Sequence, residues 1–268
     1  MNNIILPADD RLLLFGYGLF ETILITARGP LLLSLHWQRM SSGAKLLKLS
    51  FPDYSTWVQQ IQSYLQTLSS GPPFALRVTL SGGAPARNIP PQILFADRSF
   101  PYTALQSENG ICLHLLSAPR NEYSPLNKIK SANYLENILA KEEARQNNAD
   151  EGLWLNSRNF LVEGTMSNIF FISKQALHTP SLACGCLPGT RRSVILNIAE
   201  KLRIPVFEDR YTQKDLFQAD EVFVTNALMG IMPVRKINNH FFQVASSDRS
   251  DSLTRFLEHE YNRFLNNS

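Results

Sequence analysis

The sequence lacks the features that mark several broad classes of protein. Its 268 residues include three cysteines, Cys112, Cys184 and Cys186, which are too few, and odd in number, for a disulfide framework. No stretch reaches the roughly 18 consecutive apolar residues of a membrane-spanning helix. The N-terminus also lacks the basic, apolar and small-residue segments of a secretory signal. We therefore expect a protein of the reducing cytoplasm with no membrane partner.

The sequence has little excess of positive or negative charge and no internal repeats. The formal net charge is +3, and no run of Lys or Arg is long enough to form a basic stripe, so we expect no nucleic-acid partner. Cys184 and Cys186 have no second Cys or His pair nearby, so we expect small loop residues and no metal site. The sequence is 44% hydrophobic and 18% charged, which is typical of a soluble globular protein. Its length allows one large domain or two modest ones.

The hydrophobic pattern predicts an α+β (mixed α/β) chain in two parts. A smaller N-terminal α/β domain is expected over residues 1–110, a connection over 111–127, and a larger C-terminal α/β domain over 128–268. The predicted helices cover residues 34–49, 133–147, 191–202 and 252–265, and another opens at 52–53. The predicted strands cover residues 20–26, 31–33, 75–80, 92–96, 111–117, 152–155, 160–162, 168–172, 204–208 and 221–225.

One lysine and one glutamate stand out as candidate site residues. Lys130 heads the run KSANYLEN, just before a predicted helix cap, and Tyr134 follows it in the same run. Glu163 stands in the run EGTMSN, after a predicted strand. An amine can hold pyridoxal phosphate as a Schiff base, a carboxylate can pair with its pyridinium nitrogen, and the phenol of Tyr134 could bond one of its oxygens. A single lysine or glutamate is more often a solvated surface charge, so the prediction depends on the combination.

The run LPGTRR at residues 187–192 predicts a helix start that could bind the phosphate. The first N–H groups of a helix have no partner within it, so those of Thr190 and Arg191 are free to bind an anion. Arg39 could add a charge-assisted bond to the same phosphate, although a solvated helix arginine is the alternative. His36, three residues earlier, is expected to be a packed or capping histidine.

The run NALMGIMPV at residues 226–234 follows a predicted strand. Backbone N–H groups at Asn226 and Ala227 could bind the phosphate as well. The alternative is a β-turn with a core methionine, and composition does not separate the two.

Taken together, these segments resemble the class IV, fold-type IV pyridoxal-phosphate enzymes. This family includes branched-chain aminotransferases, D-amino acid aminotransferases and 4-amino-4-deoxychorismate lyases. Residues 10–22 are similar to the family's opening segment, residues 36–39 match its H-x-x-R, and residues 219–225 resemble its A-D-E strand. The resemblance implies a two-domain architecture in which Lys130 is the Schiff-base lysine, Glu163 the pyridine partner and Arg39 a phosphate ligand. It departs at Arg191, where the family often has threonine, so only the backbone N–H is carried over.

The run NALMGIMP is similar to the N-A-L-M-x-x-M-P of aminodeoxychorismate lyases. The resemblance therefore implies conversion of 4-amino-4-deoxychorismate to 4-aminobenzoate and pyruvate in folate biosynthesis. A branched-chain or D-amino acid aminotransferase is the alternative, and a non-catalytic protein with the same fold is a third. Ser81 stands where many members have arginine, which leaves Arg87 as the candidate for the substrate carboxylate, with an exposed loop arginine as the alternative reading. Members are typically homodimers, so we expect a homodimer.

Overall fold

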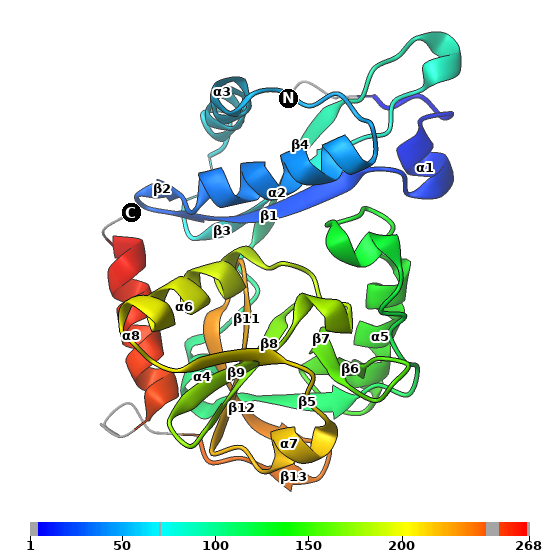
Figure 1. The fold of residues 1–268 in the computed structure, drawn as a ribbon. Coiled ribbons are helices and arrows are strands. Elements are labelled where there is room, and N and C mark those ends of the chain that lie inside the picture. The colour runs from blue at the N-terminus through cyan, green and yellow to red at the C-terminus, as the bar shows by residue number, and fades with distance from the viewer. Residues whose placement is uncertain (1–4, 70, 245–251, 267–268) are drawn as a thin grey trace. The chain divides into compact units, whose positions relative to one another are not determined.

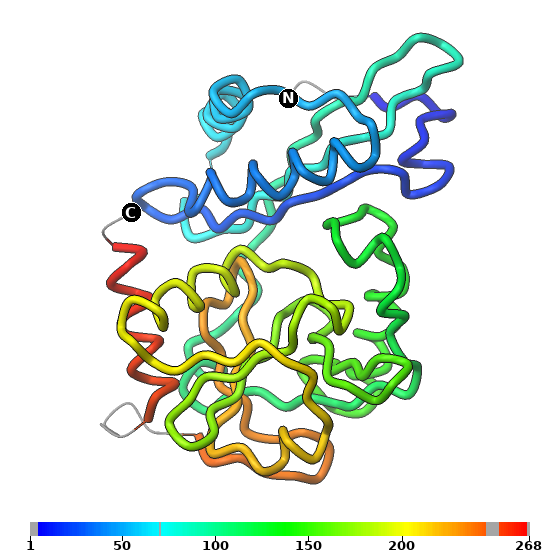
Figure 2. Tube along the Cα trace, in the orientation of Figure 1, coloured from blue at the N-terminus to red at the C-terminus, as the bar shows by residue number. Residues whose placement is uncertain are grey.

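The chain folds into two compact units. The computed structural model describes residues 5–69, 71–244 and 252–266. Unit 1 comprises residues 1–101 and 129–134, and unit 2 comprises residues 102–128 and 135–268. The chain thus leaves unit 1 after Pro101, returns to it for Ile129–Tyr134, and then stays in unit 2. Figure 2 shows the Cα trace coloured from the N-terminus to the C-terminus.

Unit 1 is built on a four-stranded antiparallel sheet in the order β2-β1-β3-β4. Helix α2 lies against β1 (Figure 1) and buries Met40 and Ala44, while α3 buries Trp57 and Ile61. Each pair is four residues apart, so both members lie on one face of the helix. The elements are α1 (Arg11–Phe15), β1 (Leu19–Thr26), β2 (Gly29–Pro30), α2 (Leu33–Leu46), α3 (Tyr54–Leu65), β3 (Phe74–Leu80), the 3-10 turn η1 (Pro85–Arg87) and β4 (Ile93–Ser99).

Unit 2 contains a nine-stranded mixed sheet in the order β10-β9-β8-β11-β12-β5-β6-β7, with β13 paired to β12. Buried apolar side chains of its central strands form the core. Helices α6 and α8 pack on each other and on β11 (Figure 1). The helices are α4 (Ala104–Asn109), η2 (Pro125–Lys128), α5 (Leu135–Gln146), η3 (Leu182–Cys184), α6 (Thr190–Lys201), α7 (Gln213–Phe217) and α8 (Leu253–Asn266). The strands are β5 (Ile111–Leu115), β6 (Glu151–Leu155), β7 (Leu161–Gly164), β8 (Asn168–Ser173), β9 (Ala176–Pro180), β10 (Val206–Asp209), β11 (Glu221–Asn226), β12 (Gly230–Ile237) and β13 (His240–Phe241).

The predicted α+β composition is confirmed, with differences in individual elements. Helix α2 begins at Leu33, one residue before the predicted start, and its N-cap residue Leu32 adopts a left-handed conformation with a φ of 54°. The return strand expected at residues 31–33 is instead the short β2 at Gly29–Pro30. Strands β9 and β12 were not predicted. No helix within the described ranges combines the length and apolar composition that a membrane crossing requires.

The two units are joined differently from the predicted division at residues 111–127. Strand β5 begins at Ile111 and pairs in parallel with β6 and β12, so part of the expected connection is a strand of the large sheet. Lys130, expected in the C-terminal domain, belongs to unit 1. Its carbonyl accepts a hydrogen bond from the N–H of Phe20 at 2.9 Å, and Ser131 forms a β-bridge with Leu19. These backbone bonds attach residues 129–134 to the start of β1.

Candidate active site

The predicted site residues fall into two groups, one in each unit. In unit 1 they are Lys130, Tyr134, Arg39 and Arg87, and in unit 2 they are Glu163, Thr190, Arg191, Asn226 and Ala227. The roles given to them from the sequence stay predictions.

The amine of Lys130 lies among aromatic rings in unit 1. Its Nζ is 4.4 Å from the ring centroid of Phe20 and 5.6 Å from that of Tyr134. The two rings meet edge to face with their centroids 5.0 Å apart. Arg77, on β3, places its guanidinium carbon 3.8 Å from the Phe20 centroid. Phe20 therefore contacts two cations, and the half-buried Lys130 is not on an exposed helix face.

Arg39 is part of a buried charged cluster with Glu21 and His36. Its Nε and Nη2 donate to the two carboxylate oxygens of Glu21 at 2.7 and 2.6 Å. Glu21 Oε2 also accepts a hydrogen bond from Nδ1 of His36 at 2.6 Å. Burial raises the pKa of the Glu21 carboxyl, but Arg39 and His36 together lower it by more. The resulting pKa is about 2. His36 is thus a packed histidine, as expected, and it forms a hydrogen bond with Glu21.

Glu163 is held in a defined orientation in unit 2. It lies on β7 with 6% of its surface exposed. Its Oε2 accepts from the side-chain amide of Asn168 at 3.1 Å and from the N–H of Leu187 at 3.0 Å. The same amide of Asn168 donates to the Leu187 carbonyl at 2.9 Å. Asn168 therefore joins the carboxylate to the segment that leads into α6.

Helix α6 begins as the run LPGTRR predicts. Gly189 occupies the N-cap position, with no side chain to cap the helix. A Cβ at position 189 would lie 1.9 Å from Oδ1 of Asn168, so only glycine fits this close approach. The N–H groups of the first turn, at Thr190 and Arg191, consequently start next to the Glu163–Asn168 pair.

The turn after β11 completes this group. Strand β11 pairs with β8 so that Thr225 lies opposite Asn168. Asn226 accepts from the N–H groups of Leu228 and Met229 at 2.9 and 3.0 Å, and its amide donates to the hydroxyl of Tyr102 at 2.8 Å. The Asn226 side chain therefore shapes the turn, so only backbone groups of Asn226 and Ala227 could bind a phosphate. The end of β11 and the start of α6 meet, since Arg191 donates to the Ala227 carbonyl.

Arg87 lies on the surface of unit 1. It ends the 3-10 turn η1, its side chain is 52% exposed, and it forms an ion pair with Asp9. Arg77 was not singled out from the sequence, although it shares the Phe20 ring with Lys130. Glu21 was noted only as part of the opening segment. For both Arg77 and Glu21, the sequence signal that could have marked them as site residues was a charged side chain within an otherwise largely apolar strand.

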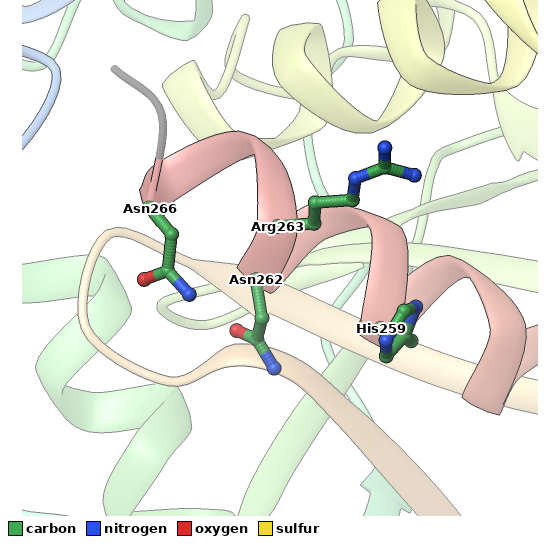
Figure 3. Close-up of a pocket in the computed structure, with 4 residues that line it drawn as sticks. All are labelled: His259, Asn262, Arg263 and Asn266. Atoms are coloured by element: carbon green, nitrogen blue, oxygen red, sulfur yellow. The ribbon is translucent and has the colours of Figure 1, made fainter.

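A metal cluster is absent from the described residues, and a surface hollow on α8 is lined by none of the predicted site residues. Within the described ranges, no three His, Cys, Asp or Glu side chains gather as a metal site would require. A surface hollow of about 530 Å³ is lined by His259, Asn262, Arg263 and Asn266, all on α8 (Figure 3). It contains none of the predicted site residues, and Arg263 and His259 are mostly exposed.

The fold and these motifs are those of a known enzyme family. The model of the class IV amino-transferase family matches residues 18–237, and the chain belongs to this family. Members of the family depend on pyridoxal phosphate. The predicted family and the fold-type IV architecture are thereby confirmed.

The proteins similar to this chain include both aminotransferases and aminodeoxychorismate lyases. A putative branched-chain-amino-acid aminotransferase of Methanocaldococcus jannaschii is 30% identical over 94% of this chain and 88% of its own length. An aminodeoxychorismate lyase of Bacillus subtilis is 28% identical over 97% of this chain and 91% of its own. Among solved structures, a putative 4-amino-4-deoxychorismate lyase from Legionella pneumophila is 29% identical with a TM-score of 0.89, covering 98% of this chain and 96% of that one.

Proposed function

We propose that this chain is a pyridoxal-phosphate enzyme that converts 4-amino-4-deoxychorismate to 4-aminobenzoate and pyruvate. The observation that carries the lyase assignment is the run NALMGIMP at residues 226–233, which forms the hairpin between β11 and β12. Similarity to proteins named as aminodeoxychorismate lyases, at 28 to 30% identity over most of the chain, supports it.

The residues present fit this cofactor in their chemistry. Lys130 would bind it covalently, and Tyr134 would bond one of its oxygens. Glu163, a buried carboxylate, would face the ring nitrogen. The uncapped start of α6 and the close fit of Gly189 against Asn168 form a cradle suited to a phosphate. Thr225 adds a buried hydroxyl without a hydrogen-bond partner among the described residues.

The phosphate would be bound mainly by backbone groups. The N–H groups at Thr190, Arg191, Asn226 and Ala227 would donate to it. Arg39 would contribute its charge while Glu21 fixes its orientation, because two strong hydrogen bonds hold the guanidinium to that carboxylate.

The bound cofactor would supply an electron sink for the negative charge that develops on the substrate carbon bearing the amine. Lys130 would remove the proton from that carbon through its Nζ, which is free once the substrate amine has taken the place of the lysine. The bond between the ring carbon and the enolpyruvyl oxygen would then break, with its electron pair leaving on the oxygen. The released enolpyruvate would take up one proton at its methylene carbon to give pyruvate, and the ring would become aromatic. This reaction needs no oxidant, reductant or second substrate. Glu163 would keep the ring nitrogen protonated.

Arg77 is a better candidate than Arg87 for a substrate carboxylate. Arg77 contacts the same Phe20 ring as the lysine, and burial lowers the pKa of its guanidinium, as does nearby Arg98. No carboxylate pairs with it in the described part of the chain. Arg87, in contrast, is exposed and already paired with Asp9. A half-buried arginine without an acidic partner suits a carboxylate ligand.

A branched-chain aminotransferase is the second candidate, because the archaeal relative with that name is 30% identical over 94% of the chain. Incubation with 4-amino-4-deoxychorismate, without any 2-oxo acid, separates the two. Formation of 4-aminobenzoate and pyruvate in equal amounts supports the lyase. Turnover of a branched-chain amino acid that depends on an added 2-oxo acid, with no 4-aminobenzoate, would show the aminotransferase instead. A protein that binds no pyridoxal phosphate would be neither.

We also propose a homodimer in the cytoplasm. Helix α5 exposes three apolar side chains, Leu135, Ile138 and Leu139, which are 64%, 49% and 63% exposed. Ile138 and Leu139 follow Leu135 by three and four positions, so the three side chains share one face of the helix. A contiguous apolar face of this kind favours a protein partner, and a second copy is the one that the family suggests.

A further inference from the structure

Arg191 is a buried arginine with an unusual set of partners. It lies in the first turn of α6 with 1% of its surface exposed. Its Nε and Nη2 both donate to the carbonyl of Ala227, at 3.3 and 2.9 Å. Its Nη1 is buried and has no hydrogen-bond partner among the described residues. The guanidinium carbon lies 5.7 Å from the ring of Tyr261, on α8.

The neighbouring Arg192 shows what a buried arginine normally requires. Arg192 is 5% exposed, and its guanidinium donates to Glu208 at 2.5 Å and to the Pro180 carbonyl at 3.0 Å. Arg191 has a carbonyl but no carboxylate, and the phenol of Tyr261 is neutral because burial raises its pKa to about 12. Burying an unpaired charge is strongly unfavourable. The burial of Arg191, which lowers the pKa of its guanidinium, therefore lacks a compensating anion within the described residues.

The surroundings of Arg191 point to the anion that compensates it. Its own N–H and that of Thr190 begin α6, and its side chain joins α6 to the turn at Asn226 and Ala227. Both segments are where we place the cofactor phosphate. A dianion there would interact strongly with a cation in a low-dielectric interior, without any direct contact. Nothing in the family resemblance requires an arginine at this position, where threonine is frequent.

We propose that Arg191 is a positioning residue whose buried charge and bond to Ala227 give the site its preference for a phosphate-bearing ligand. The proposal rests on the proposed function, since it assumes that the phosphate of pyridoxal phosphate binds at the start of α6. Arg191 acts on the phosphate through its charge and through the 226–227 turn, while the backbone N–H groups make the contacts.

The test compares two ligands that differ only in the phosphate. Dissociation constants for pyridoxal phosphate and for pyridoxal are measured by absorbance titration of the full chain and of three variants. Arg191→Gln keeps a donor for the Ala227 carbonyl but removes the charge, and Arg191→Lys keeps the charge. Arg203→Met, an exposed arginine beyond the C-terminal end of α6, is the matched control. Melting curves identify variants that fail to fold.

Arg191→Gln is expected to weaken pyridoxal phosphate binding by roughly tenfold or more and to leave pyridoxal binding unchanged. Arg191→Lys should retain most of the preference, and Arg203→Met all of it. An unchanged ratio of the two constants in Arg191→Gln, or an equal loss for both ligands, would overturn the proposal. If Arg191→Gln does not fold, the proposal is rejected when Arg191→Lys loses the preference completely. Absence of 4-aminobenzoate formation would reject the proposed reaction without altering this comparison.

Discussion

Replacing Glu21 by glutamine is expected to destabilise the protein strongly at neutral pH and only weakly in acid. The Glu21 carboxylate has no exposed surface and accepts three short hydrogen bonds, two from Arg39 and one from His36. Glutamine keeps the shape of this side chain but removes its charge. Arg39, only 10% exposed, would then remain buried without its counter-ion.

The expected magnitude follows from the pKa of the carboxyl group. It falls from 4.5 in the unfolded chain to about 2 in the folded protein. Because each pKa unit corresponds to about 1.4 kcal/mol, the ionised carboxylate contributes roughly 3 kcal/mol of folding free energy. A folded pKa that is depressed gives stability that is fully present above pH 4.5 and is lost as the pH falls through about 2. Removal of one partner of a buried ion pair costs about 3–5 kcal/mol, which agrees with this range.

Urea unfolding of the wild type and of Glu21→Gln, followed by circular dichroism across the acid range, measures the effect. The difference between the two free energies of unfolding should shrink as the pH falls below 4.5. Glu142→Gln is the control, because the Glu142–Arg145 pair is exposed and its loss should cost less than about 1 kcal/mol. A difference for Glu21→Gln that stays constant with pH, or that matches the control, would refute the reasoning.

Three further predictions concern the proposed site and the proposed dimer. Gly189→Ala places a Cβ 1.9 Å from Asn168 Oδ1, so the Asn168 amide must move. The affinity for pyridoxal phosphate, measured by titration, should therefore fall by roughly tenfold or more, and a wild-type affinity would contradict the proposed phosphate cradle. Arg77→Gln should raise the KM for 4-amino-4-deoxychorismate by roughly tenfold to a hundredfold in steady-state kinetics, whereas Arg87→Ala should change it by less than about twofold. A larger rise in KM for Arg87→Ala than for Arg77→Gln would restore Arg87 as the carboxylate ligand. Ile138→Asp should convert the dimer to a monomer in sedimentation velocity, while Glu142→Gln on the same helix should not; a dimer that survives Ile138→Asp excludes the α5 face as the interface.

Elements with strong local signals could be predicted from the sequence. Helix α3 follows Asp53, whose side chain accepts from the N–H of Thr56, and it buries Trp57 and Ile61 at helical spacing. The start of α6 was also predicted, since a proline and a glycine precede an amphipathic run. Helix α4 was not predicted, although Thr103 and Gln106 form a capping box at its start.

Other features depend on contacts between distant parts of the chain. Strand β12 contains Pro233, and proline argues against a strand interior, yet this residue pairs with Phe223 of β11. The attachment of Lys130 to unit 1 depends on backbone bonds to residues 18–20, more than a hundred positions earlier, which no local pattern encodes. The contacts of Glu21 with Arg39 and His36, and of Arg191 with Ala227, likewise join separate segments of the chain. The sequence shows the charges of these residues but not their partners.

The covalent attachment of the cofactor to Lys130 is the claim on which the proposed function depends most. Borohydride reduction of the protein with pyridoxal phosphate, followed by digestion and mass spectrometry, identifies the lysine that holds the cofactor. We predict the cofactor-derived mass on Lys130 and none on the neighbouring, exposed Lys128. Labelling of another lysine, or of none, would contradict the account.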